Sequence, residues 1–169
     1  MTQHGGSRAF LSLGSNLGER EARLGAAREA LAALPGTTIV AASGVFETAP
    51  QDLADQPSFL NQVVCLDTRL GPFELLDACQ RIENEQERVR ETRFGPRTLD
   101  VDILLFQDVV SEDPRLTLPH PRLLRRAFVL VPLAEVWDCA RGMPEYDVSA
   151  LARAAARDQA VRPYTGPEA

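Results

Sequence analysis

Two strand–helix–strand units follow one another in the first 106 residues, and this order restricts the fold more than any other feature. Short apolar or β-branched stretches predict strands, and longer stretches with apolar residues at helical spacing predict helices. The expected strands cover residues 9–13, 37–46, 59–66 and 98–106, and the expected helices cover residues 19–34 and about 71–88. This order predicts an α+β fold with a ferredoxin-like core, in which helices pack around an antiparallel sheet.

The connections and the second half of the chain are less regular. Gly14-Ser15-Asn16 is expected to end the first strand in a tight turn, and residues 48–58 and 90–97 are expected to be loops. Residues 127–136 and 148–156 predict two further helices. Because the sequence shows no repeat or linker, we expect one domain over residues 1–169, with frayed ends at 1–7 and 162–169.

Charge and composition exclude several mechanisms. The chain contains no lysine, and all 18 basic residues are arginine, so a lysine Schiff base and a Walker-type phosphate loop are both excluded. The formal net charge of −6 argues against broad nucleic-acid binding. The start has no signal-peptide pattern, and no apolar run approaches a membrane span, so a cytoplasmic protein without membrane contact is expected.

Asp100 and Asp102 interrupt an otherwise apolar strand. Side chains two residues apart on a strand point to one face, about 6.6 Å apart along the chain, so Leu99, Val101 and Ile103 are expected to face the core. Two such carboxylates repel each other unless a divalent cation lies between them, and carboxylate oxygens suit Mg²⁺. On this motif alone, an exposed pair on an edge strand is an equally good interpretation.

Arginines are concentrated around these aspartates, with nine of the 18 between residues 81 and 126. Guanidinium groups match phosphate oxygens. Arg81 and Arg88 share a helix with glutamates, so ion pairs on the helix surface explain them equally well. Arg93 and Arg97 have no such neighbours in sequence and favour a phosphate. His120 taken alone favours a structural role.

Five motifs in order resemble the hydroxymethyldihydropterin pyrophosphokinases of folate biosynthesis, over residues 11 to about 132. They are Leu13-Gly14-Ser15-Asn16-Leu17, Glu47-Thr48-Ala49-Pro50, Phe59-Leu60-Asn61, Arg93-Phe94-Gly95-Pro96-Arg97-Thr98-Leu99-Asp100-Val101-Asp102-Ile103 and Leu118-Pro119-His120-Pro121. The resemblance implies that the protein transfers pyrophosphate from ATP to 6-hydroxymethyl-7,8-dihydropterin and releases AMP.

The resemblance also implies a role for particular residues. Two Mg²⁺ ions, bound with ATP, would be held by Asp100 and Asp102, which with Arg88 and Arg97 form the expected catalytic set. The ATP site would comprise Gln80, Glu83, Arg90, Arg93, Phe94, Arg97, Ile103, Arg115, Thr117, His120 and Arg126. The pterin site would comprise Thr48, Ala49, Gln51, Phe59, Asn61 and Phe128. The expected partners are ATP and the reduced pterin, with no nucleic acid, and a monomer is the default.

Two other functions fit parts of the pattern. A nucleotidyltransferase also uses Asp-x-Asp on an apolar strand with a Gly-Ser pair, but that pair usually lies only a short helix before the aspartates. Here Gly14-Ser15 and Asp100 are separated by most of the domain. A ferredoxin-like module that binds RNA would need exposed aromatic and basic residues on its sheet. The two aspartates and the acidic net charge disfavour it.

Overall fold

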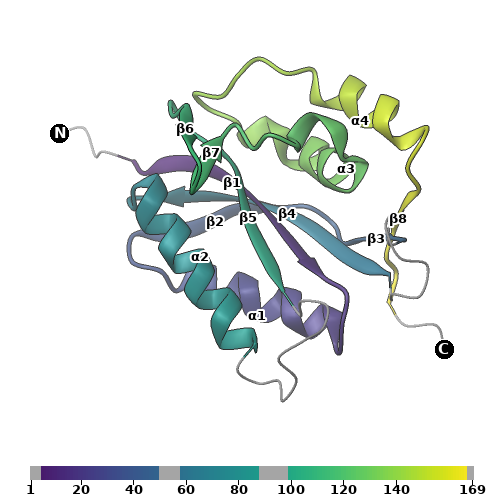
Figure 1. Ribbon diagram of the computed structural model, residues 1–169, viewed down its shortest axis with the longest axis horizontal. Coiled ribbons are helices and arrows are strands. Elements are labelled where there is room, and N and C mark those ends of the chain that lie inside the picture. The colour runs from purple at the N-terminus through teal and green to yellow at the C-terminus, as the bar shows by residue number, and fades with distance from the viewer. Residues whose placement is uncertain (1–4, 50–57, 88–98, 167–169) are drawn as a thin grey trace.

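The structure is a computed structural model that describes residues 5–49, 58–87 and 99–166. Its larger sheet contains β1 (Ser7–Ser15), β2 (Thr37–Ala42), β3 (Phe46–Thr48), β4 (Phe59–Thr68), β5 (Asp100–Phe106) and β8 (Val161–Pro163). A small hairpin is formed by β6 (Ser111–Asp113) and β7 (Leu116–Leu118). The α-helices are α1 (Arg20–Ala32), α2 (Pro72–Glu87), α3 (Ala127–Val136) and α4 (Val148–Ala156), as Figure 1 shows.

The sheet has the strand order β5-β1-β4-β3-β8, and β2 also pairs with β4. All of these pairings are antiparallel. The chain therefore runs β1-α1-β2/β3-β4-α2-β5 with the first and third main strands at the centre, which confirms the predicted α+β ferredoxin-like core. The crossovers place α1 and α2 on one face of the sheet, and α3 and α4 cover the other face (Figure 1).

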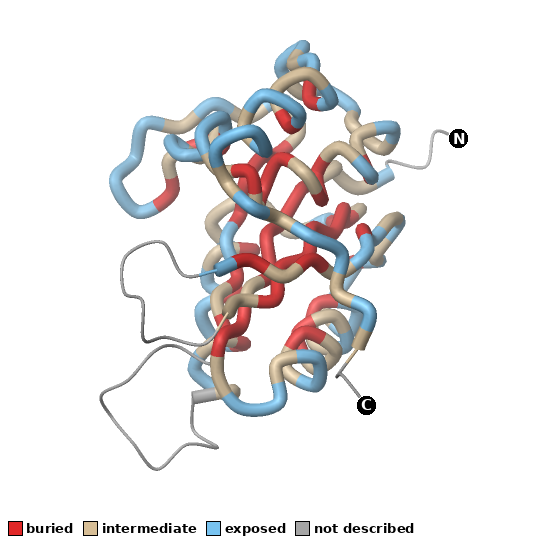
Figure 2. Tube along the Cα trace, turned by 90° about the vertical axis from the view of Figure 1, so that its right-hand side faces the viewer, coloured by how far each residue is buried: buried red, intermediate tan, exposed pale blue. Residues whose placement is uncertain are grey.

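The face toward α1 and α2, here called the α1/α2 face, is mainly apolar, with Gln62 and Thr68 of β4 as buried polar exceptions. Leu11 and Leu13 of β1, Val64 of β4 and Val101 and Ile103 of β5 are buried there. They pack in one cluster with helix residues, among them Leu24, Leu31, Leu75 and Ile82. Figure 2 shows that the buried segments run through the middle of the molecule.

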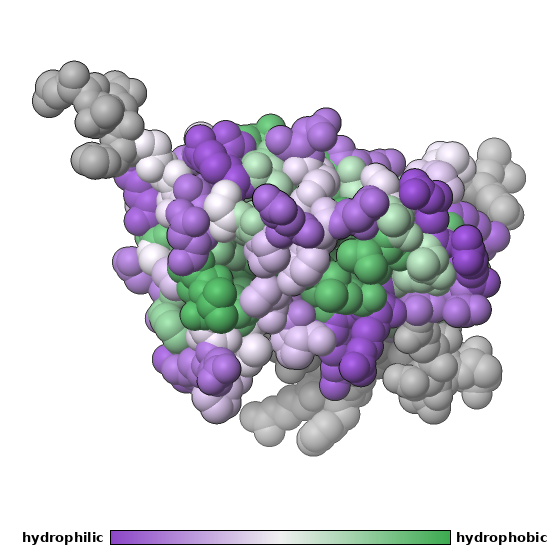
Figure 3. Space-filling view, turned by 90° about the horizontal axis from the view of Figure 1, so that it is seen from above, coloured by the Kyte–Doolittle hydropathy of each residue, from purple (hydrophilic) through white to green (hydrophobic). Residues whose placement is uncertain are grey.

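The opposite α3/α4 face carries a second apolar cluster over only part of its length. Phe10, Val63 and Leu105 are buried against α3 and α4, and the rings of Phe10 and Trp137 stack at a centroid distance of 5.4 Å. Seen from above in Figure 3, the outer surface of this layer is a mosaic of small hydrophobic patches and hydrophilic residues. In this layer α3 is apolar almost all round, and α4 turns Val148 and Ala152 inward.

The strand predicted over residues 37–46 is divided, and this prediction was wrong in its bounds. The main chain turns out of the ladder at Ser43, whose hydroxyl accepts a hydrogen bond from the Val63 N–H at 3.0 Å. Pairing resumes at Phe46 and continues to Thr48, which the sequence had assigned to a loop. Local side-chain bonding by serine competes with the ladder and explains the break.

Two further boundaries differ from prediction. Gly14 and Ser15 continue β1 because both pair with β4 and Gly14 also pairs with β5, so the expected turn begins later. The tail was expected to fray from Arg162, but Val161–Pro163 pair with β3 as β8. The two helices predicted at 127–136 and 148–156 are confirmed.

The cysteines are free thiols, and burial raises the pKa of Cys65 to about 11 and of Cys79 to about 12.

Candidate active site

The two aspartates of β5 line a cavity of about 250 Å³, here called the main cavity of the site. Asp100 is half-buried and Asp102 is exposed, whereas Val101 and Ile103 between and beyond them are buried on the α1/α2 face. The predicted alternation is therefore confirmed. β5 is the outermost strand on its side of the sheet, as the alternative interpretation expected, but both aspartates line a cavity and Asp100 is half-buried.

The floor of the cavity comes from β1, and sequence reasoning did not assign these residues to the site. Ser12 and Gly14 follow Phe10 at every second position and line the cavity. Gly14 pairs with Asp100 on one side and with Asn61 on the other, and Ser12 pairs with Asp102. A Cβ atom on Gly14 would lie 3.3 Å from the Asn61 Oδ1 atom. The absent side chain therefore keeps the floor open between the carboxylates and the amide.

Aromatic and polar groups form the side of the cavity away from the aspartates. Phe59 at the start of β4 and Phe128 in the first turn of α3 both line it, with Thr48 and Ala49 from the end of β3. Asn61 is buried, and its Nδ2 group donates a hydrogen bond to the Thr48 Oγ1 atom at 2.8 Å. Two rings and an oriented amide suit a flat heteroaromatic ligand with a polar edge.

A narrow extension of the cavity brings basic groups toward Asp102. It is lined by Ser12, Asp102, His120, Arg122 and Arg126, among others. Burial lowers the pKa of His120 from its usual value, nearby Arg126 and Arg122 lower it further, and Asp102 opposes this shift. Burial also lowers the pKa of Arg126, which stays protonated at neutral pH because an arginine titrates so high.

The orientation of the His120 ring follows from its hydrogen bond. The Arg122 main-chain N–H donates to His120 Nδ1 at 3.2 Å. In the neutral ring the proton therefore lies on Nε2, which can donate to an oxygen of a ligand. The guanidinium of Arg126 lies 5.3 Å from the centroid of the Phe128 ring, so the same residue borders both the aromatic and the charged part of the site.

Glu83 supports the aspartate strand from α2. Its Oε2 atom accepts a hydrogen bond from the Val101 main-chain N–H at 3.0 Å. Val101 lies between the two aspartates, so this contact fixes the main chain that carries both carboxylates. The structure thus gives Glu83 a supporting contact that sequence reasoning, which placed it in the ATP site, did not anticipate.

Several residues expected in the ATP site have other surroundings. Arg115 pairs with Asp77 of α2 at 3.2 Å, and its guanidinium lies 5.7 Å from the centroid of the Phe73 ring. Thr117 donates its hydroxyl hydrogen to the Asp113 carbonyl at 3.1 Å, and Gln80 is exposed on α2. Ile103 is buried in the cluster of the α1/α2 face. Some expected residues lie outside the described part of the chain. They are Arg90, Arg93, Phe94 and Arg97 of the ATP site, Arg88 of the catalytic set and Gln51 of the pterin site.

In the part of the chain that the structure describes, Asp100 and Asp102 are the carboxylates that line the cavity. Within residues 5–49, 58–87 and 99–166, no group of three His, Cys, Asp or Glu side chains is gathered closely enough to hold an ion. Two aspartates in an open cavity nevertheless fit Mg²⁺, which usually takes one or two carboxylates and completes its shell with water and substrate phosphate oxygens.

Residues 10–138 match the family model of 7,8-dihydro-6-hydroxymethylpterin-pyrophosphokinase (HPPK). The chain belongs to this family. It is 51% identical over 129 residues to the 2-amino-4-hydroxy-6-hydroxymethyldihydropteridine pyrophosphokinase of Pseudomonas aeruginosa, covering 76% of this chain and 80% of that one. Identity to the Bacillus subtilis protein of the same name is 49% over 131 residues, covering 76% and 77%.

Solved structures agree on the fold. The wild-type Plasmodium falciparum HPPK-DHPS crystal structure superposes with a TM-score of 0.65 at 16% identity, covering 92% of this chain. This HPPK-family chain spans 42% of that longer chain. Among the described residues, no helix is long and apolar enough to cross a membrane.

Proposed function

We propose that this protein transfers a pyrophosphoryl group from ATP to the hydroxymethyl group of 6-hydroxymethyl-7,8-dihydropterin, releasing AMP, as a step of folate biosynthesis. The observation that carries the proposal is one cavity that joins Asp100 and Asp102 to Phe59, Asn61 and Phe128. Carboxylates for a metal–phosphate complex and a ring-binding wall are the two parts that this reaction requires.

The pterin is assigned to the aromatic side of the cavity. Phe59 and Phe128 offer two ring faces for its bicyclic system, and offset or edge contacts of this kind are worth about 0.5–1.5 kcal/mol beyond buried area. The amide of Asn61, held by Thr48, would meet the polar edge of the pterin. Ala49 and Thr48 complete that edge, and Gln51 is proposed to join them.

The triphosphate is assigned to the charged side. Arg126 supplies a positive charge, and His120 supplies the Nε2 proton as a hydrogen-bond donor. Asp100 and Asp102 would hold two Mg²⁺ ions, and the metal when bound neutralises charge on the phosphate oxygens. Arg88, Arg90, Arg93, Phe94 and Arg97 are proposed to complete the ATP site, together with Gln80, Glu83, Ile103, Arg115 and Thr117.

In the reaction, the hydroxymethyl oxygen attacks the β-phosphorus and the bond from that phosphorus to the AMP oxygen breaks. Phosphoryl transfer passes through a loose transition state, so correct alignment of the two oxygens contributes more than deprotonation of the hydroxyl. Gly14 leaves space between Asp100 and Asn61, and this space supports the proposal that both substrates are held in one cavity. Arg126 and His120 stabilise the charge that develops on the phosphate oxygens.

A direct test is to mix the purified protein with ATP, Mg²⁺ and 6-hydroxymethyl-7,8-dihydropterin and to separate the nucleotide products by chromatography. AMP that forms only with both pterin and metal would support the proposal. ADP would indicate simple phosphorylation, and pyrophosphate would indicate a nucleotidyltransferase; either product would contradict it. Titration with Mn²⁺ in the presence of a non-hydrolysable ATP analogue would test the number of metal ions.

We also propose a single domain, a monomer in solution, a location in the cytoplasm and the absence of nucleic-acid partners. Sedimentation analysis would test the oligomeric state, and filter binding with RNA would test the last point. A cooperative unfolding transition with one midpoint would support the single domain.

A further inference from the structure

The end of the described chain, beyond the segment that matches the family model, folds back onto the active site. Residues 158–164, here called the C-terminal arm, follow α4 and include β8. Val161 pairs with Thr48, and Arg162 pairs with Glu47. The Tyr164 N–H donates to the Val45 carbonyl at 2.8 Å and extends the attachment. The arm thus adds an edge strand beside the strand that supplies Thr48 and Ala49 to the cavity.

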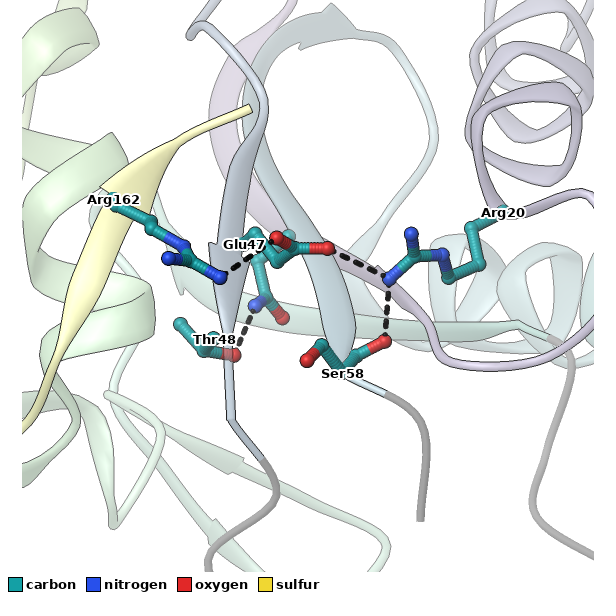
Figure 4. Close-up of polar contacts among 6 residues, drawn as sticks. Arg20, Glu47, Thr48, Ser58 and Arg162 are labelled. Carbon is teal, nitrogen blue, oxygen red and sulfur yellow. Dashed lines mark hydrogen bonds and ion pairs between the residues drawn. The ribbon is translucent and has the colours of Figure 1, made fainter. Parts of the chain in front are cut away.

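Ion pairs reinforce this attachment around Glu47 of β3. Arg162 lies 3.4 Å from Glu47 Oε1, and Arg20 lies 3.1 Å from Glu47 Oε2 (Figure 4). The same Arg20 nitrogen donates to the Ser58 carbonyl at 2.8 Å, immediately before Phe59. The guanidinium of Arg20 also lies 5.8 Å from the centroid of the Tyr164 ring. Thr48 and Phe59 therefore each directly follow a residue of this network, Glu47 and Ser58 respectively.

The second attachment of the arm is to the start of α3. The Ala127 N–H donates to Gln159 Oε1 at 2.9 Å, and Gln159 Nε2 donates to the Arg125 carbonyl at 2.9 Å. Both hydrogen bonds come from one amide, and they enclose Arg126, which lies between the two main-chain groups. Gln159 therefore fixes the turn from which Arg126 and Phe128 enter the cavity.

The first turn of α3 needs this support. Its N-cap residue, Arg126, makes no side-chain capping bond. Pro132 lies inside the helix and has no N–H to donate to the carbonyl of Phe128, four residues earlier. A helix start without a cap leaves main-chain donors unsatisfied, and Gln159 supplies an acceptor for one of them from 32 positions away.

Between the two attachments lies a cavity of about 170 Å³, lined by Thr48, Ala49 and Phe128 on one side and by residues 158–161 on the other. Thr48, Ala49 and Phe128 also line the main cavity. The arm is thus the layer directly behind the aromatic side of the site. We propose that the C-terminal arm positions the pterin-binding wall, with Gln159 as a positioning residue that holds the first turn of α3; this rests on the proposed function.

The test compares Gln159→Leu, Gln159→Glu and the wild type, with Arg157→Gln as a control at an exposed residue just before the arm. Leucine keeps the approximate size of the side chain and removes both hydrogen bonds. Glutamate keeps an acceptor for the Ala127 N–H and loses the donor to the Arg125 carbonyl. Initial rates of AMP formation at saturating ATP give kcat and the KM for the pterin, and thermal unfolding gives the Tm.

We expect the KM for the pterin to rise on the order of tenfold in Gln159→Leu, with kcat changed less than about twofold, because a displaced wall weakens binding of the ring. Gln159→Glu should give a smaller rise, and Arg157→Gln none. A lowered Tm with an unchanged KM would mean that Gln159 only stabilises the fold, and would overturn the inference.

A second variant covers the case in which Gln159→Leu does not fold. The Arg162 side chain is 78% exposed, so Arg162→Ala is expected to fold, and it weakens the attachment to β3. It should raise the KM for the pterin about two- to threefold, as the loss of a solvent-exposed ion pair allows. An unchanged KM in both Gln159→Glu and Arg162→Ala would overturn the inference with the proposed function intact. Absence of AMP from the wild type would overturn both.

Discussion

The two faces of the sheet use the same strands for different purposes. On β1, Leu11 and Leu13 point to the α1/α2 face and are fully buried, whereas Ser12 and Gly14 point to the α3/α4 face and line the cavity. On β5, Val101 and Ile103 alternate with Asp100 and Asp102 in the same way. Around the aspartates the α1/α2 face is therefore apolar, and the α3/α4 face changes from apolar to polar along β1 and β5.

This difference explains how a small domain holds two like charges close together. Two carboxylates on neighbouring positions of one strand face repel each other by about 2 kcal/mol at an effective dielectric constant near 20. Beside the aspartates, the apolar side chains that secure β1 and β5 lie on the opposite face, where each buried leucine or isoleucine contributes about 1.5–3 kcal/mol. In this part of the sheet, the side chains that stabilise the fold and those that line the cavity therefore lie on opposite faces of the same strands. Substitutions on one face should mainly change stability, and substitutions on the other should mainly change activity.

The largest expected effect is on catalysis, from Asp102→Asn. The change keeps the size of the side chain and removes a charged metal ligand, so turnover should fall on the order of a thousandfold. The unfolding midpoint should stay the same or rise, because repulsion with Asp100 is removed. Steady-state rates and urea unfolding would measure both, with Asp138→Asn at an exposed position as the control. Near-normal turnover would remove Asp102 from the metal site.

The next largest effect is on stability, from Leu11→Ala on the α1/α2 face. Removing a fully buried leucine side chain should lower the free energy of unfolding by about 2–5 kcal/mol. The folded fraction should keep its kcat, because the residue points away from the cavity. Ser12→Ala, at the next position, should change stability far less. Equal losses of stability in both variants would contradict the division between the faces.

Gly14→Ala tests the open floor of the cavity. The added methyl group would lie 3.3 Å from Asn61 Oδ1, so the amide must shift and the KM for the pterin should rise about tenfold. Gly25→Ala in α1 is a matched control, because its added Cβ has an ordinary contact at 3.6 Å and should stabilise the helix by up to about 1 kcal/mol. A Gly14→Ala protein with normal pterin kinetics would mean that the floor tolerates a side chain.

The smallest expected effect is a pH dependence of stability that comes from the polar part of the α3/α4 face. The pKa of His120 is lower in the folded protein than its usual value of 6.5, so the unfolded chain binds more protons below that pH. Stability contributed by neutral His120 should therefore be complete above about pH 6.5 and decline as the pH falls below it, by at most about 1.4 kcal/mol per pH unit. Chemical unfolding of metal-free protein between pH 5 and 8, compared with His120→Asn, would measure it. An unchanged slope in the variant would assign the dependence to other groups.

The sequence predicted those parts of the site that can be recognised from the residue types and their spacing along the chain. The spacing of Asp100 and Asp102 predicted one shared face because side chains alternate on any strand. Asn61 and Phe128 came from the family resemblance, and the structure brings both to the cavity. The helices at 127–136 and 148–156 were predicted because the first segment is almost continuously apolar and the second is rich in alanine.

Other parts depend on contacts that a linear pattern does not contain. Gly14 was interpreted as a turn residue, and only its two neighbouring strands reveal it as the floor of the site. One signal was present: Phe10, Ser12 and Gly14 alternate with leucines and alanine as a strand should. Val161–Pro163 is too short to be recognised as a strand, and its pairing with β3 creates it. Gln159 likewise has a role only because α3 starts beside it.

The position of β5 at the edge of the sheet has a further consequence for the behaviour of the protein at high concentration. An edge strand can recruit another chain through its unpaired main-chain groups and so begin aggregation. Here the outward N–H of Val101 is already bonded to Glu83, and two negative charges flank it. The other edge ends in β8, which is three residues long and contains Pro163. The groups that prepare this strand for chemistry therefore also keep it from pairing with a second molecule.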